Sequence, residues 1–108
     1  MNRGDLVLVA ISGAYGKPRP ALVIQTDFFG SHPSVTVCLV TSHLVDAPLF
    51  RYQVEPSSKN GLESVSQIQV DKIMTVPREK IGNVIGALTG KEMSAVTKLL
   101  SFWVGVAG

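Results

Sequence analysis

The sequence predicts a mainly β protein in which several short strands are followed by one C-terminal helix. Two observations support this fold class. Short apolar and β-branched runs recur along the chain, and glycines, prolines and an Asn–Gly pair separate them as turn residues do. Near the C-terminus, the apolar side chains instead repeat at helical spacing. Short strands joined by frequent turns favour a small, strongly bent barrel or sandwich.

Size and composition indicate one folded domain, residues 1–108. Of the 108 residues, 45% are hydrophobic and 17% are charged, so the chain can bury one modest core and favours an oligomer. The net charge of +2 does not oppose an anionic partner. The single cysteine, Cys38, excludes an internal disulfide. We find neither a membrane-length apolar run nor a signal peptide and expect a cytoplasmic protein.

Three strands are predicted in the first half of the chain, over residues 6–10, 20–25 and 35–41. Two glycines make residues 11–17 a predicted mobile loop, and residues 26–34 form a connecting loop. The second strand begins at Pro20 of the segment Pro18-Arg19-Pro20. Proline fixes φ, cannot donate to a strand ladder and keeps the preceding residue extended. Arg19 is therefore expected on a stiff segment at the start of a strand.

The second half is predicted to hold three more strands and the helix. The strands cover residues 52–55, residues 64–69 continued after a bend by 71–76, and residues 80–88, where two glycines favour a strand over a helix. A turn at 57–61 is signalled by Asn60-Gly61, and residues 77–79 form another. Thr89 and Glu92 have the spacing of a capping box, which predicts a helix over about 90–104 with one face on the sheet.

Five short motifs, at residues 3–9, 16–25, 35–42, 67–72 and 89–93, occur in an order and spacing that resemble the MazF/PemK toxins of bacterial toxin–antitoxin pairs. The resemblance covers nearly the whole chain. It implies a small SH3-like β-barrel of the CcdB/PemK type with a C-terminal helix, and a homodimer. It also implies a metal-independent endoribonuclease that needs no cofactor and cleaves single-stranded RNA sequence-specifically. An antitoxin would place its extended tail in the RNA groove.

Metal-free RNA cleavage uses the substrate's own 2′-OH as nucleophile and leaves 2′,3′-cyclic phosphate and 5′-OH ends. The site must take a proton from the 2′-OH, supply one to the leaving 5′-oxygen and stabilise charge on phosphorus. The two histidines and the cysteine are scattered along the sequence and predict no metal site. A guanidinium, a hydroxyl and a carboxylate are the groups left for this chemistry.

Arg19, Thr41 and Asp71 are the predicted catalytic residues. Arg19 matches the family's arginine, and its planar, permanently charged fork suits a phosphate. Thr41 closes the third predicted strand, which should neighbour the second, so the two side chains can meet. Taken alone, Thr41 is an ordinary β-branched strand residue. Asp71 is expected either to act as a base or to hold Arg19 or Lys72 in place, and we favour the structural role.

Residues that contact RNA are predicted from the same resemblance: Lys17, Ser42, Tyr52, Gln67 and Gln69. Aromatic faces stack on unpaired bases, and amides bond to base edges. Some PemK-like members carry an arginine where this chain has Gln69, so Arg19 keeps only Lys17 as a nearby cation. His43 matches no family residue and is interpreted as an exposed loop histidine, whereas Cys38 is expected in the core.

Two alternatives remain open at this stage. The related CcdB toxins poison DNA gyrase through an aromatic–glycine C-terminus, which residues 102–108 resemble loosely through Trp103 and Gly105. Trp103 also falls on the apolar phase of the predicted helix, so core packing explains it more simply. The third possibility is an SH3-like binding relative without activity. The combination of Arg19 with Thr41 separates the nuclease from the gyrase poison, which has no need of it.

Overall fold

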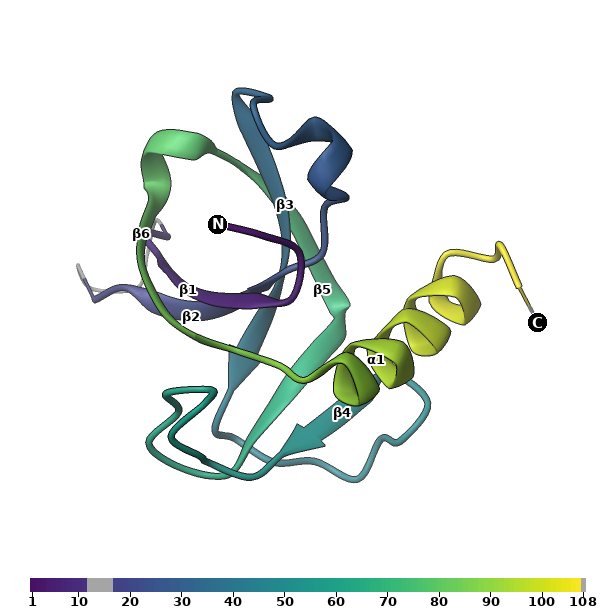
Figure 1. Ribbon diagram of the computed structural model, residues 1–108. Helices are drawn as coiled ribbons and strands as arrows, with labels where there is room; N and C mark the ends of the chain where they lie inside the picture. Colours follow the sequence, from purple (N-terminus) through teal and green to yellow (C-terminus); the bar gives the residue numbers. More distant parts are fainter. Residues whose placement is uncertain (12–16, 108) are drawn as a thin grey trace.

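A six-stranded antiparallel sheet forms the body of the protein in the computed structural model, which describes residues 1–11 and 17–107 (Figure 1). Its strands are β1 (Asp5–Val9), β2 (Arg19–Val23), β3 (Ser34–Thr41), β4 (Arg51–Val54), β5 (Ser66–Pro77) and β6 (Ile81–Ala87). They pair in the order β4-β5-β3-β2-β1-β6, so the sheet curls without closing into a barrel. The mainly β class is confirmed. Residues 12–16 of the loop predicted over 11–17 lie outside the described residues.

Two apolar clusters form because side chains alternate between the faces of each strand. On one face, Leu6, Leu22 and Cys38 are fully buried together with residues of the C-terminal helix. The opposite face buries a valine-rich cluster: Val7, Val9, Ala21, Val23, Val35, Val37 and Val76. A β-branched run such as residues 35–41 is buried on both sides for this reason.

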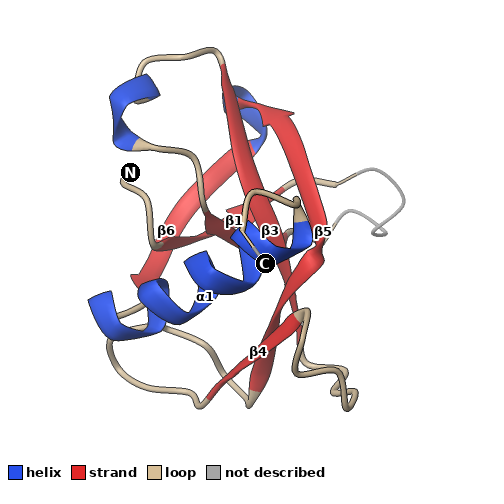
Figure 2. Ribbon diagram, turned by 90° about the vertical axis from the view of Figure 1, so that its right-hand side faces the viewer, coloured by secondary structure: helices blue, strands red, loops and turns tan. Residues whose placement is uncertain are grey.

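Helix α1 (Gly90–Trp103) lies across one side of the sheet and packs against β5 (Figure 2). The predicted capping box is confirmed: Glu92 N donates to Thr89 Oγ1 at 3.1 Å, and Thr89 N donates to Glu92 Oε1 at 2.8 Å. The expected core packing of Trp103 is wrong, because this side chain is 50% exposed and its ring centroid lies 6.0 Å from that of Phe50. Within the described part of the chain, no helix has the length and apolar character needed to cross a membrane.

The register of β3 and β5 shifts at a bulge in β5, which lies between the two halves predicted for this strand. Cys38 of β3 faces Ile73, whereas Val40 faces Ile68, so residues 69–72 of β5 lie opposite Leu39 alone. Extra residues on one strand bend that strand and increase its twist. Asp71 lies in this bulge, where its side chain is freed from the regular alternation of the ladder.

The turn predicted at residues 57–61 is fixed against β6 by backbone contacts. Ala87 N donates to Lys59 O at 2.9 Å. A Cβ atom at Gly86 would lie 2.3 Å from the carbonyl carbon of Asn60, so only glycine permits this approach. The Asn60 side chain is buried and closes the turn through three hydrogen bonds to the backbone of its own loop. The residues that follow this turn are thereby held beside the sheet.

Candidate active site

A groove of about 570 Å³ lies where β2 begins and β3 ends. One wall is Pro18-Arg19-Pro20, a second is Thr41-Ser42-His43, and a third is residues 61–64, which follow the turn held on β6. Its floor is largely apolar and consists of Leu8, Val40, Ser66 and Ile85. A concave surface with a few polar groups around an apolar floor is the usual form of a ligand site.

Arg19 and Thr41 meet at this groove because β2 and β3 are paired. Ala21 faces Leu39 in the antiparallel register, and continuing that register by two residues sets Arg19 opposite Thr41. Arg19 is exposed and Thr41 is half-buried. The expectation that the second and third strands are neighbours is confirmed, and Arg19 and Thr41 both line the groove. A guanidinium and a hydroxyl side by side can both donate to the oxygens of one phosphate.

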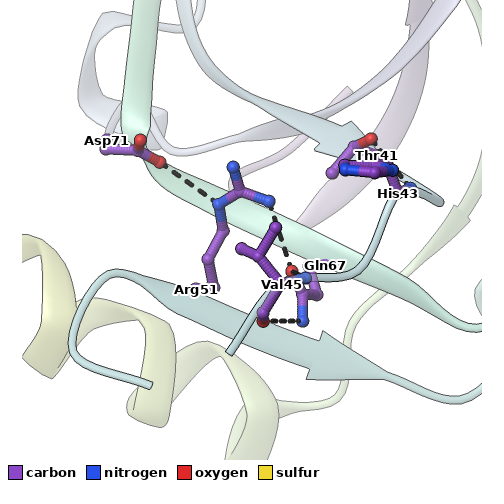
Figure 3. A network of polar contacts seen from close by, with 6 residues as sticks. All are labelled: Thr41, His43, Val45, Arg51, Gln67 and Asp71. Atoms are coloured by element: carbon purple, nitrogen blue, oxygen red, sulfur yellow. Dashed lines mark hydrogen bonds and ion pairs between the residues drawn. The ribbon is translucent and has the colours of Figure 1, made fainter. Parts of the chain in front are cut away.

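The chain leaves β3 through a short turn that Thr41 itself organises. The backbone N–H of His43 donates to Thr41 Oγ1 at 3.1 Å, and the two residues lie together at the strand end (Figure 3). The hydroxyl accepts this bond, so its own proton is available to a ligand. Ser42, between them, also lines the groove.

Asp71 does not line this groove and instead pairs with Arg51 (Figure 3). Asp71 Oδ1 lies 3.5 Å from Arg51 Nε, and the two side chains are only 19% and 13% exposed. The partners expected from the sequence, Arg19 and Lys72, are wrong. Arg51 was missed because its approach to Asp71 depends on the pairing of β4 with β5. In that register Arg51 faces Gln69, two residues before Asp71.

Gln67 is buried, and its amide is occupied by the loop that follows β3. Its Oε1 accepts from Val45 N and from Arg51 Nη1, both at 3.2 Å. Its Nε2 donates to Val45 O at 2.9 Å and to Gln53 Oε1 at 3.3 Å. The side chain therefore positions the segment between β3 and β4, which begins with the groove residues Ser42 and His43.

The other predicted RNA contacts are spread over the surface. Tyr52 lines a second groove, of about 650 Å³, between β4 and α1, together with Arg51, Lys91 and Lys98. Gln69 is half-buried in the β5 bulge, and Lys17 is exposed just before β2. The structure thus brings Arg19, Thr41 and Ser42 together but separates them from Asp71 and Tyr52.

Cys38 is buried as expected and takes no part in either groove. Burial raises the pKa of its thiol to about 12, and the nearby Asp71 carboxylate adds to this increase. The thiol is therefore protonated and unreactive near neutral pH. Among residues 1–11 and 17–107, no three His, Cys, Asp or Glu side chains gather closely enough to hold a metal ion.

Comparison with known proteins links this geometry to a family. Residues 2–104 match the family model described as PemK-like, MazF-like toxin of type II toxin–antitoxin system. A relative from Mycolicibacterium smegmatis, named "Probable endoribonuclease MazF", is 43% identical over the full length of both chains. An endoribonuclease MazF from Staphylococcus saprophyticus is 26% identical over 98% of this chain and 92% of its own.

Solved structures share the fold at lower identity. A mycobacterial endoribonuclease in complex with its cognate antitoxin superposes with a TM-score of 0.84 at 18% identity, covering 100% of this chain and 98% of that one. The Mycobacterium tuberculosis toxin MazF-mt6 gives a TM-score of 0.82 at 21% identity, covering 96% and 99%. At this level of identity, the likeness is one of fold.

Proposed function

This chain belongs to the PemK-like, MazF-like family of type II toxin–antitoxin toxins, and we propose that it is a metal-independent endoribonuclease that cleaves single-stranded RNA. The observation that supports the proposal most directly is the meeting of Arg19 and Thr41 on one groove. The permanently charged guanidinium of Arg19 and the hydroxyl of Thr41 are suited to bind a phosphate that gains negative charge during the reaction. Sequence-specific cleavage of mRNA would stop translation and growth.

In the proposed mechanism, the 2′-oxygen of the substrate attacks the adjacent phosphorus and displaces the 5′-oxygen. The products are a 2′,3′-cyclic phosphate and a 5′-OH end. Arg19 neutralises the non-bridging oxygens, while the hydroxyls of Thr41 and Ser42 donate to them. Asp71 supports the site indirectly, because it fixes Arg51, which in turn contacts Gln67.

The RNA contacts extend this proposal beyond the point of cleavage. Lys17, next to the Arg19 wall, would bind a neighbouring phosphate. Tyr52, in the groove that also contains Lys91 and Lys98, would stack on a base while those cations hold the backbone. Gln69 is a candidate contact at the rim of β5, and Gln67 contributes by positioning the loop after β3.

Partners and setting follow from family membership. We propose a cytoplasmic homodimer, built from a single domain of residues 1–108, that a cognate antitoxin neutralises by laying an extended tail in the RNA groove. A structural relative was solved with its antitoxin bound, which supports a partner of this kind. An acidic tail would be attracted to Arg19 and Lys17 as a phosphate is.

The test is cleavage of single-stranded RNA by the purified protein in EDTA. We expect new 5′-OH ends, detected because a kinase labels them directly. Arg19→Ala should lower the rate by about 10²–10³-fold, the usual cost of removing a donor to the transition state. Lys80→Ala, an exposed cation in the turn between β5 and β6, is the matched control and should retain full activity. Full cleavage by Arg19→Ala would contradict the site, and a requirement for metal would contradict the mechanism.

The gyrase alternative rests on the aromatic–glycine C-terminus, in which Trp103 is 50% exposed and is followed, after Val104, by Gly105. A chain ending at Val104 separates the two functions. If the protein is a nuclease, this truncated chain still cleaves RNA and arrests growth. Loss of growth arrest with RNA left intact by both proteins would favour the gyrase target.

A further inference from the structure

Proton transfer is the part of the proposed reaction that Arg19 and Thr41 do not supply. A guanidinium does not release its proton at relevant pH, and a threonine hydroxyl is a poor base. Asp71 is paired with Arg51 and does not line the groove. Among the described residues that line it, the charged or titratable side chains are Arg19, His43 and Glu63.

We infer that His43 is the general base of the cleavage, an assignment that rests on the proposed function. Its backbone N–H is bonded to Thr41 Oγ1 at 3.1 Å (Figure 3). The register of β2 and β3, continued by two residues from Ala21 and Leu39, sets Thr41 opposite Arg19. His43 lines the same groove as Arg19 and Thr41, so a phosphate held between those two residues lies in the groove that His43 borders. The residue is exposed, so the imidazole can reach a ribose hydroxyl without displacing the core.

Glu63 is the competing base, and its position makes it the weaker one. It belongs to the opposite wall, after the turn fixed on β6, whereas His43 follows Thr41 by two residues on the same wall. A carboxylate is also repelled by the phosphate that the groove is proposed to hold. Histidine, in contrast, changes charge near neutral pH, where a general base works best. The opposite-wall carboxylate would stabilise the imidazolium that forms.

The step balances without a further reactant. The neutral imidazole of His43 takes the proton of the 2′-OH as the bond from the 2′-oxygen to phosphorus forms. The bond from phosphorus to the 5′-oxygen breaks, and that oxygen takes a proton from a water molecule in the open groove. The hydroxide left behind removes the proton from the imidazolium and restores His43.

The experiment compares His43→Asn with His32→Asn in single-turnover RNA cleavage from pH 5 to pH 9, in EDTA. The chain has two histidines, and His32 lies in the loop before β3, away from the groove lining. We expect His43→Asn to lower the rate at pH 7.5 by about 10²-fold or more and to abolish its rise with pH. His32→Asn should behave as wild type. Binding of an uncleavable RNA with a 2′-deoxy sugar at the cut should change less than about threefold in His43→Asn.

Each other result overturns the assignment. A rate that falls in His43→Asn while its rise with pH persists would show a positioning role, because only loss of the base removes that dependence. If the cleavage rate no longer rises with pH in Glu63→Gln but still does so in His43→Asn, then Glu63 is the general base. Equal melting temperatures, together with a second variant, His43→Gln, exclude misfolding as the cause. If wild type itself leaves RNA intact, it is the proposed function that fails.

Discussion

The guanidinium of Arg51 and the carboxylate of Asp71 form a mostly buried ion pair, with Nε 3.5 Å from Oδ1, at the bulge of β5. This pair joins the edge strand β4 to the bend in β5. Arg51 also donates to Gln67, which holds the loop after β3. The pair is thus connected, through one glutamine, to the segment that carries Ser42 and His43.

Removing one partner of this pair should lower the stability of the fold much more than it slows catalysis. We expect Asp71→Asn and Arg51→Met each to lower the free energy of unfolding by about 2 kcal/mol, because a mostly buried charge loses its partner. A double-mutant cycle by urea denaturation should give a coupling energy of about 1–3 kcal/mol. Folded Asp71→Asn should cleave RNA within about threefold of wild type. A loss beyond about 100-fold without lost stability would make Asp71 catalytic.

Gln67 should prove to be a positioning residue for the loop after β3. Gln67→Leu removes both hydrogen bonds to the Val45 backbone, so the free energy of unfolding should fall by about 1–2 kcal/mol. Hydrogen exchange at the Val45 amide should accelerate. Gln69→Leu makes the same chemical change at a half-buried site outside both grooves and should cost less than about 0.5 kcal/mol. Equal exchange at Val45 in the two variants would contradict this role.

Gly86 should tolerate no side chain, because its Cβ would lie 2.3 Å from the carbonyl carbon of Asn60 and 2.5 Å from the carbonyl oxygen of Lys59. Gly86→Ala must displace the 57–61 turn and should cost more than about 2 kcal/mol, measured by thermal or urea unfolding. The matched control is Gly90→Ala at the start of α1, where a Cβ meets nothing within 4 Å. That change should be neutral or stabilising by up to about 1 kcal/mol. Similar losses in both variants would refute the close approach.

Cys38 should make the fold sensitive to alkaline pH. Its folded-state pKa is raised from 9.0 to about 12, first by burial and second by Asp71. Between these values, the unfolded chain releases the thiol proton while the folded chain keeps it, so rising pH favours unfolding. The stability that the protonated thiol contributes to the fold is fully present below pH 9. Above pH 9, the free energy of unfolding declines by about 1.4 kcal/mol per pH unit.

Urea denaturation at pH 8 and pH 10.5 measures this effect against Cys38→Ala, which cannot titrate. Between pH 8 and pH 10.5, the free energy of unfolding should fall by about 2 kcal/mol more in wild type than in the variant. The interval from pH 8 to pH 9 adds little to this difference, because the thiol is still protonated in the unfolded chain there. The folded wild type should also react slowly with a thiol reagent at pH 7.5 and rapidly in denaturant. Parallel pH slopes for the two proteins would contradict the shift.

Local sequence signals determined the elements and one half of the site. Strand alternation, the Asn60-Gly61 turn and the Thr89–Glu92 capping box depend on residues close in the chain, so they were predictable. The pairing of β2 with β3, which brings Arg19 and Thr41 to one groove, also followed, because the second and third strands are consecutive and consecutive strands are usually neighbours.

Only the tertiary structure decided the rest, because it depends on register and on contacts between distant segments. The bulge in β5 sends Asp71 to Arg51 rather than to Arg19, and the backbone contact at Gly86 supplies the third wall of the groove. The helix ends beyond the edge of the core and leaves Trp103 half exposed, although its periodicity matches that of buried Val96. The periodicity of apolar residues determines on which face of a helix or strand a side chain lies. Which other segment packs against that face depends on the whole fold.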